Sequence, residues 1–450
     1  MSEHQDPHTR RTFLTRTSCG LGAATLAQLF ASRTTASAAG LPGFPNFTPR
    51  AKRIIYLHMS GGPSQLETFD PKPDLAKWDG KPLPAEVRGD QRLTTMTSGQ
   101  GAINVMASQH KFARHGQAGM DMNVLFKHMP EIADDICLIR STTTDPINHD
   151  PAVTFLQTGS PLSGRPCMGS WLSYGLGSAN ENLPAFVVLL SGGGQPVPSR
   201  YWHNGFLPSR HQGVKFQSSG DPVLFLSNPQ GMSKENRRKT IDRINALNQL
   251  KHQQSGDPEI EARIDAFQLA YRMQGSVPGL MDISREPKSV LESYGAQPGK
   301  ASFAANCLLA RRLAEAGVRF IQLYDRGWDH HDGITNAIKG KINAVDRPST
   351  ALLQDLKERG MLEDTLVIWG GEFGRTTYAQ TRNKNFGRDH HPRCFSMWMA
   401  GGGVKPGMIH GSSCAFGYNV AENPVHVHDL QATILQLLGI DHQALTFRFK

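Results

Sequence analysis

The sequence predicts one α/β domain at residues 50–450, with a mostly parallel central sheet and helices on both of its faces. Two observations support this prediction. Short aliphatic runs that are apolar throughout, rather than alternating with polar residues, are typical of strands buried on both faces. Helical patterns that end at glycine separate these runs, and the repeated order of strand, helix and strand favours parallel pairing. A chain of 450 residues is long enough for such a domain.

The expected elements follow one another along the chain. Strands are expected at 54–57, 136–139, 186–190, 318–323 and 365–369, with a further apolar run at 395–400. One helix is expected to begin at about Val124, and another just after His149, with Pro151 in its first turn. Three more are expected at 302–316, 351–359 and 430–438. Asp429 is the expected N-cap of the last helix. Residues 234–295 are polar and helical in pattern, which predicts an inserted helical hairpin on one side of the core, with a solvated charged face.

The N-terminus has the features of an export signal. Arg10 and Arg11 form a twin-arginine pair, and the apolar stretch 19–30 that follows is too short to span a bilayer. Small residues at 35–39 suit a signal peptidase. We therefore expect residues 1–38 to be a twin-arginine signal peptide that directs the protein to the periplasm or cell exterior. The alternative is a disordered N-terminus with a chance arginine pair.

Charge and composition exclude several classes of protein. The net charge is +9, and removal of residues 1–38, with four arginines and two acids, leaves about +7. A basic chain favours anionic substrates through its overall field, although solubility alone would also explain the charge. No run of basic residues is interleaved with aromatics, which argues against nucleic acid. No segment of the mature chain approaches eighteen apolar residues, so no membrane span is expected. The five cysteines beyond residue 38 are scattered, and one or two disulfides of undefined connectivity are compatible with export.

Metal-binding residue types follow the predicted strands. Ligands of open α/β sheets bind beyond the carboxyl ends of the strands. Directly after strand 318–323, the segment 325–332 holds three acids and two histidines, among them Asp329 and His331. So many charges are costly to hold together unless a cation neutralises them, and aspartate oxygen with histidine nitrogen suits Zn²⁺, Mn²⁺ or Fe²⁺. A polar surface loop is the alternative.

Three other element boundaries carry similar residues. Glu372 lies among glycines after strand 365–369, where the backbone can approach an ion closely, although a surface pair of Glu372 and Arg375 would also fit. His390 lies in a second Asp-His-His triplet at 389–391. His149 would begin a helix, whose positive end favours an anionic ester oxygen; a simple capping hydrogen bond is the alternative.

The order of these motifs resembles the alkaline phosphatase superfamily, which includes sulfatases and cofactor-independent phosphoglycerate mutases. More closely, the chain resembles an exported domain-of-unknown-function family of sulfatase-like proteins within it. The motifs that carry this resemblance span nearly all of residues 50–450 and lie at 60–65, 69–73, 327–331, 371–376, 387–390, 400–403, 427–430 and 438–442.

The resemblance implies an alkaline phosphatase/sulfatase-like fold with a divalent metal, for which zinc is expected. Asp329, His331 (or His330) and His390 match the ligands of one metal. At the second metal, Ser60 stands where the superfamily has Asp, and Glu372 with the following phenylalanine replaces an Asp-His pair. Glu372 can still bind a metal, so one tight site and a weaker second site are implied.

The resemblance also places His149 where sulfatases have a cysteine nucleophile and phosphatases a serine or threonine. Three roles for His149 stay open: nucleophile, base, or a metal ligand that replaces lost ones. The implied function is metal-dependent hydrolysis of phosphate or sulfate esters, on an anionic small molecule or a polysaccharide. Residues expected to hold the anion are Ser60, Ser64, Asn148 and Arg375.

Two other functions remain open. The missing hydroxyl or thiol at position 149, together with Phe373, is compatible with a degenerate protein of the same fold. Such a protein would bind a carbohydrate or a partner in the periplasm without cleaving it. Phosphoryl transfer or isomerisation, as in the mutases, is the third possibility. The sequence leaves the oligomeric state undefined.

Overall fold

The computed structural model describes residues 40–194, 196–224, 226–380 and 385–449. The expected signal peptide at 1–38, with Arg10 and Arg11, lies outside the described residues, so export remains a prediction. Within the described ranges, no helix is both long enough and apolar enough to cross a membrane.

A nine-stranded sheet forms the centre of the molecule. From one edge to the other its strands are β12 (Met408–His410), β4 (Ile136–Thr143), β11 (Phe395–Ala400), β8 (Thr365–Gly370), β1 (Arg53–Ser60), β7 (Phe320–Arg326), β5 (Phe186–Gly192) and β6 (Val214–Phe216), and β15 (Val425–His426) also pairs with β4. Strand β11 runs antiparallel to both of its neighbours, whereas the other pairs in this sheet are parallel. The prediction of a mostly parallel sheet is confirmed.

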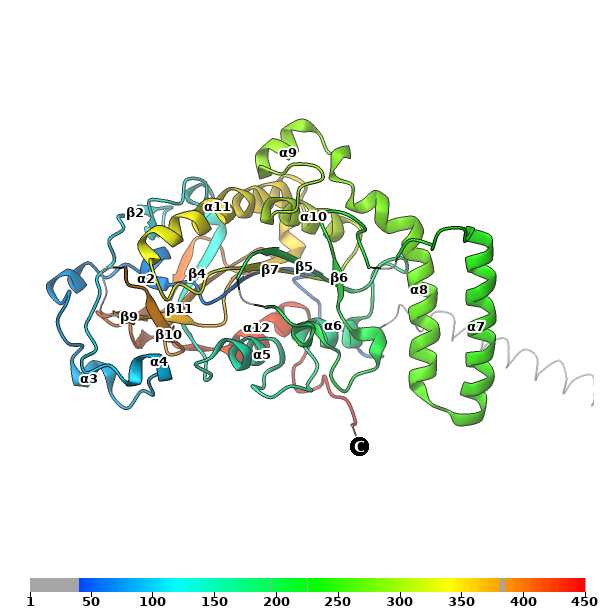
Figure 1. Ribbon diagram of the computed structural model, residues 1–450, viewed down its shortest axis with the longest axis horizontal. Coiled ribbons are helices and arrows are strands. Elements are labelled where there is room, and N and C mark those ends of the chain that lie inside the picture. Colours follow the sequence, from blue (N-terminus) through cyan, green and yellow to red (C-terminus); the bar gives the residue numbers. More distant parts are fainter. Residues whose placement is uncertain (1–39, 195, 225, 381–384, 450) are drawn as a thin grey trace, which may run out of the picture.

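Helices cover both faces of the sheet, as predicted. On one face lie α10 (Phe303–Glu315) and α11 (Ile334–Glu358), and on the other lie α5 (His149–Thr158), α6 (Met168–Leu176) and α12 (Val427–Leu437) (Figure 1). Strand β1 shows why its sequence is mostly apolar, because Ile55 and Leu57 enter the core under α10 while Ile54 and Tyr56 enter the core on the other face. A strand buried on both sides has no face in contact with solvent, so its sequence lacks the alternation of apolar and polar residues.

The pairing register brings several strand ends together. β1 lies between β7 and β8, with Ser60 opposite Arg326 and His58 opposite Gly370. These three parallel strands therefore end side by side at one edge of the sheet. Strand β4 runs in the same direction, and the antiparallel β11 begins at that edge. The segments that follow β1, β4, β7 and β8, and the segment that precedes β11, all meet there.

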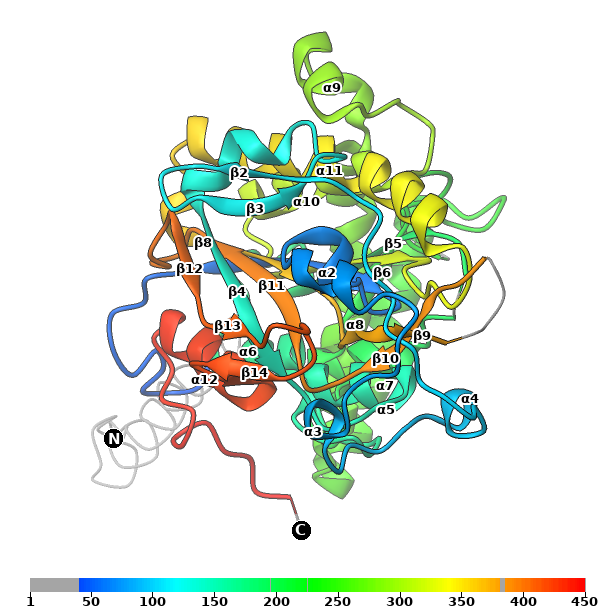
Figure 2. The same ribbon diagram turned by 90° about the vertical axis from the view of Figure 1, so that its left-hand side faces the viewer.

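A hairpin at this edge, formed by β9 (Gly374–Ala379) and β10 (Arg388–His391), links β8 to β11. Figure 2 shows this hairpin close to α2 (Gln65–Thr68), with α3 (Ala85–Arg88) and α4 (Thr95–Ser98) in the neighbouring loops. Smaller elements complete the fold: β13 (Ser412–Ser413), β14 (Val420–Glu422), and the 3₁₀ helices η1 (Pro73–Lys77), η3 (Ser199–Trp202), η4 (Ser209–His211), η5 (Ile283–Arg285) and η6 (Leu362–Asp364).

Three helix predictions need correction. The helix expected from Val124 is wrong, because turns and then the 3₁₀ helix η2 (Met129–Asp135) occupy this segment, directly after an antiparallel hairpin of β2 (Phe112–His115) and β3 (Met120–Asn123). Met120 and Met122 are both buried, which is the two-residue period of a strand. The N-cap of α12 is His426 rather than Asp429. Asp429 is the N3 residue of a capping box, and its carboxylate accepts a hydrogen bond from the backbone N–H of His426.

Helix α11 begins much earlier than the predicted residue 351. It contains Pro348 in its interior, and Ile338, Ile342 and Val345 from its first half are buried against the core. The apolar spacing of three to four residues is typical of a helix face. Proline within a helix usually marks a boundary, and here the buried face on both sides of it outweighs that cost.

Residues 234–281 form two antiparallel helices, α7 (Lys234–Ser255) and α8 (Pro258–Met281), beside the sheet, and α9 (Lys288–Tyr294) follows them (Figure 1). The end of α8 enters the core through Val277 and Met281, whereas Leu247 of α7 is 67% exposed. Most of α7 is therefore solvated. The five cysteines within the described residues are free of disulfides.

Candidate metal centre

Four side chains converge at the sheet edge described above. Asp329 and His331 follow β7, His390 lies in β10 before β11, and His149 is the first residue of α5, after β4. One ligand atom from each of these residues can be chosen so that all four lie within 4.8 Å of one another. The structure thus brings together four of the residues that the sequence singled out.

The carboxylate of Asp329 occupies the middle of this group. Its Oδ1 lies 2.7 Å from Nε2 of His331, 3.1 Å from Nε2 of His149 and 3.4 Å from Nε2 of His390. The Nε2 atoms of His331 and His390 are 3.0 Å apart. Three imidazole nitrogens and one carboxylate oxygen therefore face a common point.

The opposite nitrogen of each imidazole faces an oxygen acceptor. Nδ1 of His149 lies 2.6 Å from Oε1 of Glu372, and Nδ1 of His390 lies 2.9 Å from the carbonyl oxygen of Ile147. Nδ1 of His331 contacts Oε1 of Gln380. These acceptors assign the proton of each ring to Nδ1, which leaves the lone pair of each Nε2 directed at the group. Histidines that bind metals are held by this arrangement.

Glu372 lies behind His149 and is not one of the four converging residues. Its side chain is fully buried, and its carboxylate accepts the backbone N–H of Gly61 at 3.0 Å. Its other oxygen lies 3.3 Å from Nε2 of His58. Burial alone would raise the pKa of Glu372, but the two histidines hold that pKa well below its ordinary value. Glu372 is thus an ionised carboxylate that orients His149.

The charges of the group are mutually dependent. Burial would raise the pKa of Asp329, but His149, His331, His390 and the charge of Arg375 hold that pKa far below its ordinary range. Burial would lower the pKa of His149, but its contacts with Asp329 and Glu372 raise the pKa above its ordinary value. Burial, assisted by the charge of Arg375, lowers the pKa of His390 to about 4. An ionised Asp329 and a neutral His390 are therefore ready to bind a cation near neutral pH.

Arg375 is fully buried, and its guanidinium contacts protein groups. Nη2 donates to Oδ1 of Asp329 at 2.6 Å and contacts the carbonyl oxygen of Gly61, while Nε donates to that of Gly62 at 2.9 Å. Nη1 donates to the carbonyl oxygen of Arg388 at 3.0 Å. These contacts favour a role in positioning Asp329, and the predicted contact of Arg375 with substrate stays a prediction.

The remaining residues that the sequence predicted are the substrate contacts Ser60, Ser64 and Asn148 and the alternative metal ligand His330. Ser60 is 5% exposed, and Ser64 is 1% exposed with its hydroxyl contacting Glu67. Asn148 is exposed, and as N-cap of α5 it makes no side-chain capping bond. His330 is buried outside the four-residue group, and burial with nearby Arg375 lowers its pKa to about 4.

Two glycines allow the close packing of this edge. Gly61 has a φ of +118°, and a Cβ atom there would lie 2.5 Å from the backbone nitrogen of Asp329. A Cβ atom on Gly62, with a φ of +70°, would lie 2.7 Å from the ring of Phe373. Any larger residue would have to displace backbone at Gly61 and the Phe373 ring at Gly62. The Phe373 ring itself lies 4.8 Å from that of His149 and 4.7 Å from that of His390, between centroids.

Sequence reasoning missed three contributors to the centre. His58 lies within an otherwise apolar strand, and a polar residue there is the signal that could have identified it. Gln380 and the carbonyl group of Ile147 support His331 and His390, but nothing local in the sequence distinguishes them. Their roles depend on contacts between distant segments.

The donor set can be tested against the metal that the sequence implies. Three imidazole nitrogens and one carboxylate oxygen suit Zn²⁺, and also Mn²⁺ or Fe²⁺. The Nδ1 contacts turn each Nε2 toward the group and Asp329 is ionised, while His149, whose pKa is raised, would release its Nε2 proton when a cation binds. The residues of this site therefore fit a divalent metal.

Comparison with known proteins identifies a family and several solved structures to which the chain is similar. The family model described as "Protein of unknown function (DUF1501)" matches residues 51–450. No curated protein matches the chain. Among solved structures, Ps i-CgsB in complex with k-i-k-neocarrahexaose is 12% identical, with 87% of this chain and 72% of that chain covered and a TM-score of 0.40.

Two further structures are similar to the same extent. The PsFucS1 sulfatase from Pseudoalteromonas sp. is 12% identical, with coverages of 88% and 69% and a TM-score of 0.35. Alkaline phosphatase from the Antarctic bacterium TAB5 is also 12% identical, with coverages of 87% and 98% and a TM-score of 0.31.

Proposed function

The chain belongs to the DUF1501 family, and from its own site geometry we propose that it is a metal-dependent hydrolase of phosphate or sulfate esters. One observation carries the proposal. Each of three histidines directs Nε2 toward Asp329 while its Nδ1 faces an oxygen acceptor. Such orientation by surrounding oxygen atoms is typical of metal ligands and is not needed for a polar surface loop.

In this proposal His149, Asp329, His331 and His390 hold one divalent ion, most simply Zn²⁺. A bound ion would polarise the ester oxygens and lower the pKa of a bound water. Glu372 holds the ring of His149, and Arg375 holds the carboxylate of Asp329. Phe373 offers no ligand atom where the wider superfamily has a histidine, so we propose a single tight site.

His149 is proposed as a ligand rather than as a nucleophile. Its Nδ1 faces Glu372 and its Nε2 faces Asp329, so both ring nitrogens are committed. None of the four residues of the centre carries a hydroxyl or a thiol. The geometry therefore favours direct attack by water over a covalent enzyme intermediate.

The proposed setting is outside the cytoplasm. Arg10 and Arg11, with the short apolar stretch after them, support twin-arginine export. This route carries folded proteins, so a metal could be bound before export.

Metal analysis and an activity panel test the proposal. Purified protein should contain about one equivalent of metal, lose thermal stability on dialysis against a chelator, and cleave 4-nitrophenyl phosphate or 4-nitrophenyl sulfate. His331→Ala should abolish the metal content and the cleavage. His128→Ala, which removes a half-exposed histidine of a surface pair with Glu131, should change neither. Absence of metal, with unchanged stability in chelator, would contradict the proposal.

A non-catalytic binding protein is the second candidate. The lack of a hydroxyl or thiol in the centre and the position of Phe373 against His149 and His390 support it. This candidate predicts stoichiometric metal binding without cleavage of any ester in the panel. If His149→Ala abolished a measurable hydrolysis, the protein would not be a mere binder.

A further inference from the structure

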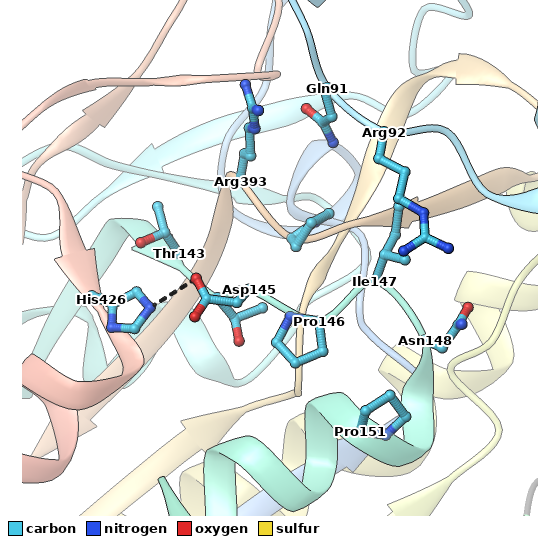
Figure 3. Close-up of a pocket in the computed structure, with 12 residues that line it drawn as sticks. Gln91, Arg92, Thr143, Asp145, Pro146, Ile147, Asn148, Pro151, Arg393 and His426 are labelled. Carbon is cyan, nitrogen blue, oxygen red and sulfur yellow. Dashed lines mark hydrogen bonds and ion pairs between the residues drawn. The ribbon is translucent and has the colours of Figure 1, made fainter. Parts of the chain in front are cut away.

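A pocket of about 520 Å³, drawn in Figure 3, is lined in part by residues adjacent in sequence to the candidate metal centre. Part of its wall is Ile147 and Asn148, which directly precede His149. Another part is Pro392 and Arg393, which directly follow His391. Its other lining residues are Gln91, Arg92, Thr143, Thr144, Asp145, Pro146, Pro151 and His426. The volume is within the range of pockets that hold small organic ligands, and it exceeds what a lone anion needs.

Two buried polar atoms of the pocket wall have no hydrogen-bond partner within the described part of the chain. They are Oε1 of Gln91 and Oγ1 of Thr144, in residues that are 8% and 5% exposed. The amide nitrogen of Gln91 is engaged, because it lies 3.1 Å from Nδ1 of His391. Buried polar atoms are rarely left unpaired, since each lost hydrogen bond is costly. An amide oxygen accepts from an O–H or N–H group, and a hydroxyl can donate or accept, so a ligand that carries hydroxyl groups would suit these two atoms.

Two arginines supply positive charge to the same pocket. Arg92 is exposed and has no carboxylate within ion-pair distance among the described residues. The one carboxylate that pairs with Arg393 in the described part of the chain is that of Asp90, at 3.1 Å, and the Asp90 side chain is 93% exposed. The acid that lines the pocket, Asp145, already lies 3.3 Å from Nε2 of His426 (Figure 3). The guanidinium groups are therefore available for an anionic ligand.

The remaining wall is apolar and rigid. Pro146, Pro151 and Pro392 line the pocket together with Ile147. Such a surface can pack against the C–H groups of a ring while the polar groups bind its substituents. Partners for hydroxyl groups, a partner for an anion and an apolar wall thus occur in one pocket.

We propose that this pocket binds an acidic sugar residue, which is a hydroxylated ring carrying a carboxylate or sulfate group. Arg92 and Arg393 bind the anionic group, and Gln91 and Thr144 bind ring hydroxyls. The proposal rests on the proposed function in one respect, because it takes the bound sugar to be part of the ester substrate. The substrate class would then be an acidic glycan, held beside the metal centre by a second contact.

Calorimetric titration of the metal-loaded protein tests the pocket. The probes are oligogalacturonate, sulfated galacto-oligosaccharides, neutral galacto-oligosaccharides and sodium sulfate. The acidic oligosaccharides should bind at least about tenfold more tightly than the neutral ones, and more tightly than sulfate. Oligogalacturonate has no sulfate ester, so its binding distinguishes a carboxylate from a sulfate as the recognised anion.

Three variants locate the binding. Arg92→Gln and Arg393→Gln should each weaken binding of acidic oligosaccharides by about tenfold. Arg285→Gln, which removes an exposed arginine paired with an exposed aspartate at a distant helix, should leave it unchanged. Thr144→Val should weaken binding without lowering the melting temperature, because the hydroxyl that it removes has no partner within the protein.

Several outcomes would overturn the pocket proposal: no binding of acidic oligosaccharides, equal binding of neutral ones, or affinities that both arginine variants leave unchanged. If sulfate bound as tightly as the oligosaccharides, the pocket would be a simple anion site, and the acidic-sugar proposal would also be overturned. Cleavage of 4-nitrophenyl esters is measured separately. Cleavage without sugar binding would reject the pocket alone, whereas sugar binding without cleavage would reject the proposed hydrolase and retain the acidic-sugar site.

Discussion

Oε1 of Glu372 lies 2.6 Å from Nδ1 of His149, on the side of the imidazole opposite Asp329. The carboxylate and the histidine therefore form a pair in which one group orients the other toward the proposed metal. Glu372 is fully buried, and its ionised state is maintained by His149, His58 and the backbone N–H of Gly61. This relationship favours an orienting role for Glu372, and the ligand role that the sequence predicted for it stays a prediction.

We predict that Glu372→Gln weakens zinc binding by about 10- to 100-fold without unfolding the protein, because outer-shell partners tune ligand affinity by that amount. Competition with a chromophoric chelator measures the dissociation constant. Glu363→Gln, at an exposed acid, is the control. If Glu372→Gln lost zinc as completely as Asp329→Asn, Glu372 would be a direct ligand, and the orienting role would be wrong.

Gly61→Ala should lower both stability and zinc affinity. The positive φ and the 2.5 Å approach of a Cβ atom to the nitrogen of Asp329 imply strain of about 1–3 kcal/mol, relieved by displacing Asp329. Thermal unfolding and zinc titration check the two effects. Gly99→Ala is a matched control, since Gly99 has a φ of −84° and open space around its Cβ position. Equal melting temperatures for both variants would contradict the expected strain.

The buried pair of Glu67 and Arg388 should make stability depend on pH. Their side chains are 2% and 0% exposed, with Oε1 of Glu67 2.8 Å from Nη2 of Arg388. Burial would raise the pKa of Glu67, but Arg388 holds that pKa below its ordinary value in the folded protein. The stabilisation is therefore fully present above the unfolded pKa of about 4.3, and it is lost as the pH falls from there through the lower folded pKa.

Glu67→Gln leaves the Arg388 charge buried without a counter-ion, so we expect a loss of about 3–5 kcal/mol at pH 7. The difference in melting temperature between wild type and Glu67→Gln should shrink as the pH falls below about 4.3. Thermal unfolding of both proteins from pH 7 to pH 3 measures this. A difference that stayed constant over that range would show that the carboxylate is not the titrating group.

Lys341 should stabilise the end of β7 by neutralising Asp325. Its Nζ lies 2.7 Å from Oδ2 of Asp325, which is 2% exposed, and 2.6 Å from the carbonyl oxygen of Arg326. Lys341→Met should cost about 3 kcal/mol because the carboxylate stays buried without its partner. The double variant with Asp325→Asn should recover part of this loss in thermal unfolding. Lys339→Met, at an exposed lysine, should have little effect, and a similar loss there would count against the ion pair.

The sequence located most of the candidate site because strand ends are a local property. Apolar runs mark the parallel strands, and Asp329 and Glu372 lie within a few residues of where β7 and β8 end. Parallel strands place their carboxyl ends at one edge, so those residues were expected to meet. The hairpin of β2 and β3 escaped this reasoning because each of its strands has only four residues, too few for a clear apolar pattern.

The sequence by itself thus determined the α/β class, the buried strands and the segments from which Asp329, His149, His331 and His390 come, because periodicity and composition act over a few residues. Only the tertiary structure decided that Glu372 supports His149, that Arg375 is buried against Asp329, and that Gln91 and Thr144 face one pocket. Glu372 and His149 are 223 positions apart. Contacts of this kind depend on the strand order and on packing across the sheet edge, which local sequence does not encode.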